Sequence, residues 1–109
     1  MALAESCYLL TYAFPKDEAF GLTSQFRRAA ASVPANIAEG HGRENARTFV
    51  QYLRIARGSL KELETHLLLA ESVGTASKAL IDPAMLQCEA LGKMLRALIR
   101  SLQQKSAAS

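Results

Sequence analysis

Apolar side chains return at every third or fourth position along residues 45–73, and this is the clearest pattern in the chain. The positions are Ala46, Phe49, Leu53, Ala56, Leu60, Leu63, Leu67 and Ala70. Such a heptad spacing is typical of a helix that packs one face against other helices in a bundle. Asn45 is a good N-terminal cap and Gly74 a good C-terminal stop, so the sequence predicts one long helix here.

The first segment, residues 2–14, shows the same period. Its apolar face is formed by Leu3, Cys7, Leu10 and Phe14. Pro15 ends the segment, because a residue before proline tends to leave the helical region. Residues 15–18 favour a short helical turn that Gly21 ends.

A second helix is predicted from a cap at Thr23 or Ser24 to a stop at Gly40 and Gly42. Its stripe consists of Leu22, Phe26, Ala29, Val33 and Ile37. Pro34 lies inside this stripe and predicts a kink, because proline lacks a backbone donor and crowds the carbonyl one turn earlier.

The last helix is predicted to begin at Asp82 and Pro83, a cap followed by proline at the first helical position. Residues 75–81 are then a linker. The stripe of this helix consists of Met85, Cys88, Leu91, Leu95, Leu98 and Leu102. Residues 103–109 are small and polar and predict a flexible tail.

Four amphipathic helices with mostly short connections pack best as antiparallel neighbours. The 109 residues are 50% hydrophobic and 21% charged, a globular composition of single-domain size. The predicted fold is therefore all-α: one antiparallel up-and-down four-helix bundle over residues 1–109.

No motif for catalysis, metal binding or cofactor binding is present. Glu62, Glu64 and His66 lack the Glu-x-x-His spacing of di-iron bundles. Residues 40–43 lack the phosphate-loop pattern and are interpreted as a helix stop and turn. We therefore expect neither an enzyme nor a bound cofactor or metal. Cys7 and Cys88 lie far apart in the sequence and are expected to be buried as small hydrophobes in a reducing compartment.

The first residues lack the positive charge of a secretory signal, and no apolar run reaches the roughly 18 residues of a membrane helix. We expect a cytoplasmic protein that does not contact membranes.

Positive charge gathers on the long predicted helix. Five cations and one acid, Glu44, lie between residues 43 and 61; the cations are Arg43, Arg47, Arg54, Arg57 and Lys61. Arg47, Arg54 and Lys61 are spaced by seven and share one line of the helix. Such a line can follow the phosphates of a polyanion. The alternatives are a solvated face or ion pairs between subunits. The net charge of +3 permits a nucleic-acid partner without requiring one.

Gly58 lies in the middle of the best helix, where glycine costs about 1 kcal/mol relative to alanine. With Ser59 and Ala56 it indicates close approach of another backbone, either within the bundle or from another subunit. Glu39 is near the negative end of a helix dipole. It is either a solvated side chain or one compensated by Arg43 or by an arginine of a partner chain.

The chain resembles the 23S ribosomal RNA intervening-sequence proteins. The resemblance extends over about residues 12–102 and is carried by FPKDE at 14–18, GLTSQFRRAA at 21–30, SVPANIAEG at 32–40, IARGSL at 55–60 and ELET at 62–65. The first segment departs from the family, which usually has a longer first helix with a tryptophan near its start. This chain has no tryptophan.

The resemblance implies a four-helix bundle without enzymatic activity that assembles into a ring, commonly a pentamer. Some members are encoded inside insertions in ribosomal RNA genes, and similar bundles contact a reverse transcriptase and RNA. The partners implied are further copies of the chain and RNA or an RNA-handling protein. The residues assigned to a subunit interface or structural motif are Ser32, Pro34, Asn36, Glu39, Gly40, Gly58 and Ser59. The functional hypotheses are an RNA-associated oligomer or an oligomeric scaffold that binds a protein without nucleic acid.

Overall fold

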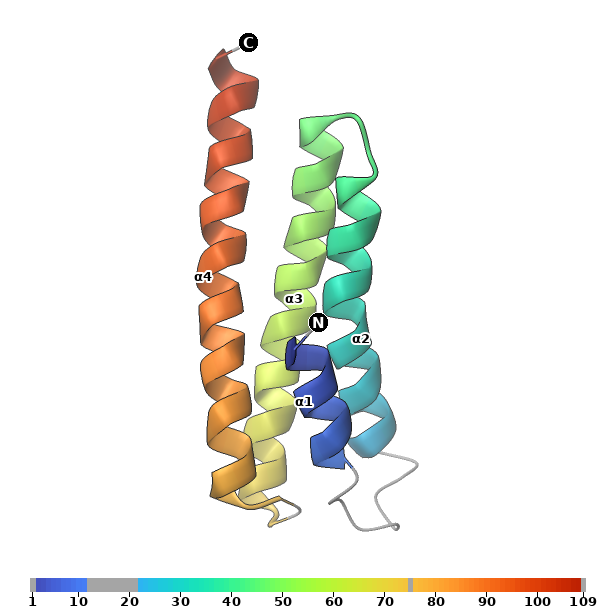
Figure 1. Ribbon diagram of the computed structural model, residues 1–109, viewed down its shortest axis with the longest axis vertical. Helices are drawn as coiled ribbons and strands as arrows, with labels where there is room; N and C mark the ends of the chain where they lie inside the picture. The colour runs from blue at the N-terminus through green and yellow to red at the C-terminus, as the bar shows by residue number, and fades with distance from the viewer. Residues whose placement is uncertain (1, 12–21, 75, 109) are drawn as a thin grey trace.

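The computed structural model describes residues 2–11, 22–74 and 76–108. These residues form four helices: α1 (Ala2–Thr11), α2 (Leu22–His41), α3 (Ala46–Ser72) and α4 (Lys78–Ala108). Successive helices run in opposite directions, as Figure 1 shows, and the described part contains no strand. The predicted all-α antiparallel four-helix bundle is confirmed.

The third helix, α3, is the centre of the bundle. It packs against α2 on one side and α4 on the other, while α1 packs against α2 and α4. Its buried residues are Val50, Leu53, Ala56, Leu60, Leu63, Leu67 and Ala70. The predicted stripe is thus confirmed from Leu53 to Ala70, while Phe49 is only partly buried.

Both predicted ends of α3 are also confirmed. The Oδ1 atom of Asn45 accepts hydrogen bonds from the backbone N–H groups of Arg47 at 2.8 Å and Thr48 at 3.4 Å. These bonds satisfy two of the donors that a helix start leaves unpaired. Gly74 follows the helix with φ = 78°, the left-handed conformation that glycine adopts without a steric penalty.

The first helix, α1, lies alongside only one half of α2 and α4 (Figure 1). Its predicted face is confirmed for the described residues, because Leu3, Cys7 and Leu10 are all buried. Arg27 of α2 also holds α1. Its Nε donates to Oγ1 of Thr11 at 2.8 Å, and its guanidinium lies 5.5 Å from the centroid of the Tyr8 ring.

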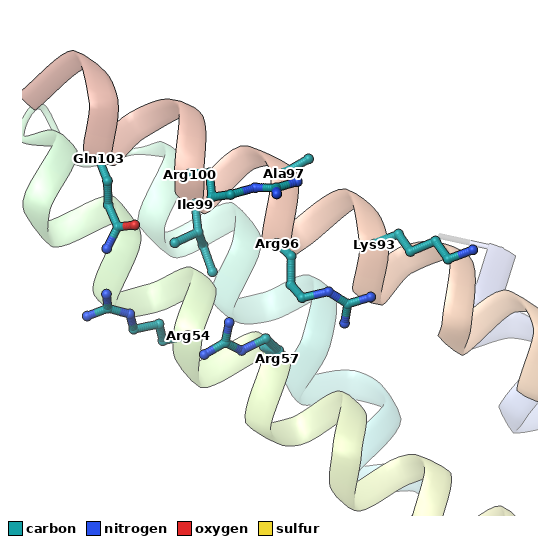
Figure 2. A pocket seen from close by; sticks show the side chains of 8 residues that line it. All are labelled: Arg54, Arg57, Lys93, Arg96, Ala97, Ile99, Arg100 and Gln103. Carbon is teal, nitrogen blue, oxygen red and sulfur yellow. The ribbon is translucent and has the colours of Figure 1, made fainter.

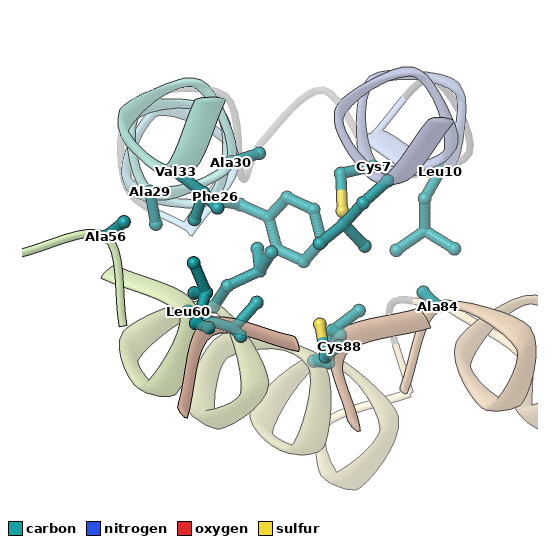
Figure 3. Close-up of a cluster of buried hydrophobic side chains, with 14 of the residues drawn as sticks. Cys7, Leu10, Phe26, Ala29, Ala30, Val33, Ala56, Leu60, Ala84 and Cys88 are labelled. Carbon is teal, nitrogen blue, oxygen red and sulfur yellow. The ribbon is translucent and has the colours of Figure 1, made fainter. Parts of the chain in front are cut away.

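The core at the α1 end is centred on Phe26, which reaches from α2 toward Cys7 of α1 and Cys88 of α4 (Figure 3). Both cysteines are free and have no solvent exposure. Burial raises the pKa of each thiol to about 12, because the interior disfavours the charged thiolate. The prediction that these cysteines are buried small hydrophobes is confirmed.

The predicted start of α4 is wrong. The helix begins at Lys78 instead of Pro83, and the N–H groups of Leu80 and Ile81 both donate to the carbonyl of Ser77 at 3.0 Å. Burial of Ile81 in the core favours the extra turn. The carbonyl of Ala79, which Pro83 cannot bond, belongs to an exposed residue.

Other predicted boundaries differ less. The helix α2 begins at Leu22, so neither Thr23 nor Ser24 is its cap, and it continues through Pro34 to His41. The kink at Pro34 stays a prediction. The helix α4 extends to Ala108, so the predicted tail is helical over residues 103–108, and its flexibility stays a prediction. The predictions for residues 12–21, including Phe14, the turn at 15–18 and Gly21, lie outside the described residues.

Truncating Leu63 should test the role of the α3 stripe. Leu63 has no solvent exposure, so we expect Leu63→Ala to lower the free energy of unfolding by about 2–5 kcal/mol. Leu69→Ala is the matched control on the same helix, because Leu69 is 48% exposed and its truncation should change stability by about 0.5 kcal/mol or less. Urea denaturation followed by circular dichroism measures both. Equal losses in the two variants would contradict the assigned core face.

Candidate functional site

A basic groove runs between α3 and α4, and its largest cavity lies on the half of the bundle that α1 leaves uncovered. Its largest cavity has a volume of about 680 Å³ and is lined by Arg54, Arg57, Lys93, Arg96, Ala97, Ile99, Arg100 and Gln103. Figure 2 shows side chains reaching into this space from both helices, Arg54 and Arg57 from α3 and Arg96 and Gln103 from α4. Five of the eight lining residues are cations and none is an acid.

The groove continues in both directions along the helix pair. Toward the start of α3, a cavity of about 450 Å³ is lined by Arg47, Val50, Gln51, Arg54 and Gln103. Toward the middle of the molecule, a cavity of about 270 Å³ is lined by Arg57, Leu60, Lys61, Glu64, Cys88, Glu89, Gly92, Lys93 and Arg96. These three cavities together form the basic groove.

The cations of the largest cavity have no acidic partner in the described part of the chain. Ion pairs within it join Arg28 to Glu62, Arg43 to Glu39, Lys61 to Glu64 and His66 to Glu62. None of these pairs involves Arg54, Arg57, Lys93, Arg96 or Arg100. The groove therefore carries a concentrated positive potential that screening by water and salt reduces but does not cancel.

Four of the five cations predicted from the sequence line the basic groove: Arg47, Arg54, Arg57 and Lys61. Lys61 is partly neutralised there, because its Nζ lies 3.6 Å from Oε2 of Glu64.

The fifth predicted cation, Arg43, lines none of the three cavities and pairs locally instead. Its Nη2 donates to Oε1 of Glu39 at 2.6 Å and to the hydroxyl of Tyr52 at 3.1 Å, and its guanidinium lies 5.3 Å from the centroid of the Tyr52 ring. The hydrogen bond to Glu39 raises the pKa of Arg43 above its usual value. Glu39 is therefore both solvated, with 57% of its side chain exposed, and compensated by Arg43.

Sequence reasoning missed three cations of the groove, namely Lys93, Arg96 and Arg100 of α4. A signal was present, because these residues are spaced by three and four and so share one face of a helix. What the sequence did not contain is the register that brings this face opposite Arg54 and Arg57.

The residues assigned to a structural motif lie mainly at the contact between α2 and α3. The hydroxyls of Ser32 and Ser59 are 2.8 Å apart across this contact. Asn36, one turn further along α2, donates through Nδ2 to the carbonyl of Ser32 at 2.8 Å and to its hydroxyl at 3.0 Å. Pro34 lies between them and is partly buried. This arrangement satisfies polar groups at a helix contact, and it contains no pocket or nucleophile-base pair.

The helix α2 ends at His41, between the two glycines where the sequence predicts its stop, and Gly40 also lies at a close approach of α2 and α3. It is buried inside α2, one residue before the helix ends. A Cβ atom added there would lie 2.6 Å from Cβ of Tyr52 and 2.9 Å from Cδ1 of Phe49. Glycine is required here because any side chain would force the two helices apart.

Gly58 has the opposite environment. It is exposed, and a Cβ atom added there would meet nothing within 4 Å. The first of the two explanations for this glycine, close approach within the bundle, is therefore wrong. Contact with another subunit stays a prediction.

The described residues contain no group of three or more His, Cys, Asp or Glu side chains that could hold a metal ion. No helix in the part of the chain that the structure describes is long and apolar enough to cross a membrane. The chemistry that the basic groove offers is that of anion binding by guanidinium and ammonium groups.

Comparison with known families gives a match over most of the chain. The family described as 23S rRNA-intervening sequence protein matches residues 1–97. This chain belongs to that family. No curated protein matches the sequence. The matched residues of this 23S rRNA-intervening sequence protein include the cations of the groove from Arg47 to Arg96, while Arg100 and Gln103 lie beyond the match.

In this 23S rRNA-intervening sequence protein, the same substitution at two glycines should have opposite effects. We expect Gly40→Ala to lower the free energy of unfolding by about 1–3 kcal/mol, because the new methyl group clashes with Tyr52 and Phe49. Gly58→Ala should raise it by about 0.5–1 kcal/mol, because alanine fits the open space and restricts the unfolded chain. Urea denaturation at low protein concentration measures both. A stable Gly40→Ala variant would contradict the close approach of α2 and α3.

Proposed function

We propose that this protein is a non-enzymatic, homo-oligomeric helical bundle of the cytoplasm that binds RNA phosphates through the basic groove. One observation carries the proposal. Arg54, Arg57, Lys93, Arg96 and Arg100 come from two helices and line one cavity that no acidic residue lines.

The electrostatics of this cluster favour a polyanionic partner. Like charges gathered in one groove repel one another, and a surface without a partner would disperse them or interleave them with acids. A bound polyanion replaces this repulsion with attraction between opposite charges. It also releases its condensed counterions on binding. RNA is the polyanion most in keeping with the family description.

Recognition through this groove should depend on charge and not on base sequence. Its lining contains aliphatic, amide and charged side chains, Gly92 and the thiol of Cys88, and no aromatic ring. Tyr52 contacts Arg43, and Phe49 packs edge-on against His41, so both rings are engaged outside the groove lining. Without rings to stack on bases, the groove is suited to the phosphates of structured RNA.

Assembly into a homo-oligomer is the second part of the proposal, and the family resemblance favours a pentamer. Gly58 and Ile55 support it, because they lie on the outer surface of α3 without covering groups. Ile55 is 52% exposed, and Gly58 is open to solvent. A partner copy that covers this surface would explain why a mid-helix glycine is tolerated there.

The alternative is an oligomeric scaffold that binds an RNA-handling protein and no nucleic acid. In that case the cations of the groove would pair with carboxylates of the partner or of a neighbouring subunit. Acids suited to such pairing lie outside the largest cavity: Glu71, Asp82 and Glu89 are in the other half of α3 and α4. Titration with RNA separates the two hypotheses.

RNA binding is tested by fluorescence anisotropy with a labelled RNA hairpin at salt concentrations between about 50 and 200 mM, a range over which the affinity of phosphate contacts falls strongly. We expect Arg54→Gln with Arg96→Gln to weaken binding and to reduce the slope of log K against log salt by about one to two units. The matched control is Arg28→Gln with Lys78→Gln, which removes the same charge from exposed positions outside the groove.

Equal effects of the two double variants would show that net charge, and not the groove, determines the affinity. The absence of RNA binding by the unmodified protein at the lower salt concentration would contradict the proposal and favour the scaffold alternative.

Assembly is tested by light scattering after size exclusion at tens of micromolar protein. We expect a single oligomeric species, and Ile55→Glu should shift it toward the monomer because a buried carboxylate at a subunit contact is costly. Leu86→Glu is the control, since Leu86 is 65% exposed on α4. A monomeric unmodified protein would contradict the assembly, and an unchanged Ile55→Glu oligomer would exclude the outer surface of α3 as the contact.

A further inference from the structure

Carboxylates line the basic groove at one end only. The two cavities nearest the C-terminal end of α4 are lined by cations and by no carboxylate. The third cavity is also lined by Glu64 and Glu89. The third cavity keeps an excess of cations, because Arg57, Lys61, Lys93 and Arg96 also line it, but its two carboxylates weaken the attraction of a polyanion that follows the groove from Arg47.

Three cations lie where the carboxylates begin. Arg57, Lys93 and Arg96 line both the largest cavity and the cavity that contains the carboxylates. They come from both helices, so an anion between α3 and α4 can be contacted from two sides.

Gly92 lies beside one of these cations. Gly92 is buried, and a Cβ atom added there would lie 3.4 Å from Nη1 of Arg96 and 3.6 Å from Cδ2 of Leu60. Arg96 is an exposed residue whose guanidinium lies beside Gly92. Figure 2 shows Arg57 reaching toward the same groove from the opposite helix.

We propose that Arg57, Lys93 and Arg96 bind the terminal phosphomonoester of an RNA chain, whose remaining phosphates follow the cations toward Arg47. This inference rests on the proposed function, because it assigns the end of the RNA that the basic groove binds. The binding is reversible, and no bond is made or broken.

The chemistry of the three cations suits a monoester better than an internal phosphate. A phosphomonoester carries a charge of about −1.5 to −2 at pH 7 and presents three acceptor oxygens, whereas an internal diester carries a single charge. Arginine offers a planar pair of donors that matches two phosphate oxygens, and lysine adds a point charge. Two arginines and one lysine thus match the larger charge of a chain end.

The carboxylates beyond this point explain why a chain end is favoured over the middle of a chain. An RNA whose backbone continued through the third cavity would bring its next phosphates close to Glu64 and Glu89. Lys61 pairs with Glu64 and offsets part of the repulsion, so the carboxylates weaken the attraction for a continuing chain without reversing it. An RNA that ends at Arg57 and Arg96 gains the attraction of the cations and avoids the carboxylates.

The experiment compares RNAs of one sequence that differ only at their ends, by fluorescence anisotropy with an internal label. The probes carry a 5′ phosphate, a 3′ phosphate or hydroxyls at both ends. We expect one phosphorylated RNA to bind about tenfold more tightly than the hydroxyl form, the effect of one additional charge-assisted contact. Binding that is independent of the end groups would overturn the inference and leave the proposed function standing. Failure of all three RNAs to bind would overturn both.

Variants test whether the groove determines the preference for a phosphorylated RNA end. Arg57→Gln with Arg96→Gln should abolish the preference for the phosphorylated end. In contrast, Arg47→Gln should weaken the binding of all three RNAs by the same factor. Glu64→Gln with Glu89→Gln should selectively strengthen the binding of the RNA with hydroxyls at both ends, because the repulsion beyond the site is removed. Circular dichroism spectra confirm that each variant is folded. A preference that persists in the Arg57 and Arg96 double variant would overturn the assignment.

Competition distinguishes an RNA end from a free phosphomonoester. Adenosine monophosphate at the concentration of the RNA should fail to displace it, because a mononucleotide has no further phosphates to contact the cations toward Arg47. Displacement at equal concentration would overturn the assignment to RNA in favour of a free nucleotide.

Discussion

Burial of the apolar stripe of α3 is the constraint on which the rest of the structure depends. Leu53, Leu60, Leu63 and Leu67 are almost completely removed from solvent, and α2 and α4 both pack on this helix. Each fully buried leucine contributes on the order of 1.5–3 kcal/mol relative to exposure. Because one helix orients both neighbours, its rotation also determines which of its polar residues face α2 and which face α4.

The two polar edges of α3 have different chemistry as a result. The edge toward α2 contains Ser59 and Tyr52, which take part in neutral hydrogen bonds and in the contact with Arg43. The edge toward α4 contains Arg54 and Arg57, which face further cations. One side of α3 thus joins two helices through satisfied polar groups, while the other side gathers like charges.

Much of the fold could be predicted from the sequence, because its signals are local. The heptad stripe, the cap at Asn45 and the stop at Gly74 each depend on residues within a few positions of one another. The start of α4 could not be predicted in this way, since Asp82 and Pro83 gave a strong local signal that the burial of Ile81 overrides. The close approach at Gly40 could not be predicted for a similar reason, because it depends on Tyr52 of another helix.

Only the α3 half of the candidate site could be predicted from the sequence. The cations of α3 were visible as a line, but Lys93, Arg96 and Arg100 join them only through the register between two helices. Arg43 belonged to the same run of sequence and lies elsewhere, because Glu39 and Tyr52 hold it. Periodicity indicates which residues share a face of one helix, whereas a site built from two helices requires the packing between them.

The shortness of α1 makes the two halves of the molecule mechanically unequal. Around Phe26, four helices enclose the side chains, so any change in helix spacing disturbs contacts on every side. Toward the other end only α2, α3 and α4 are present among the described residues, and fewer contacts resist a small change in the distance between α3 and α4. The largest cavity of the basic groove therefore lies where fewer helices hold α3 and α4 together.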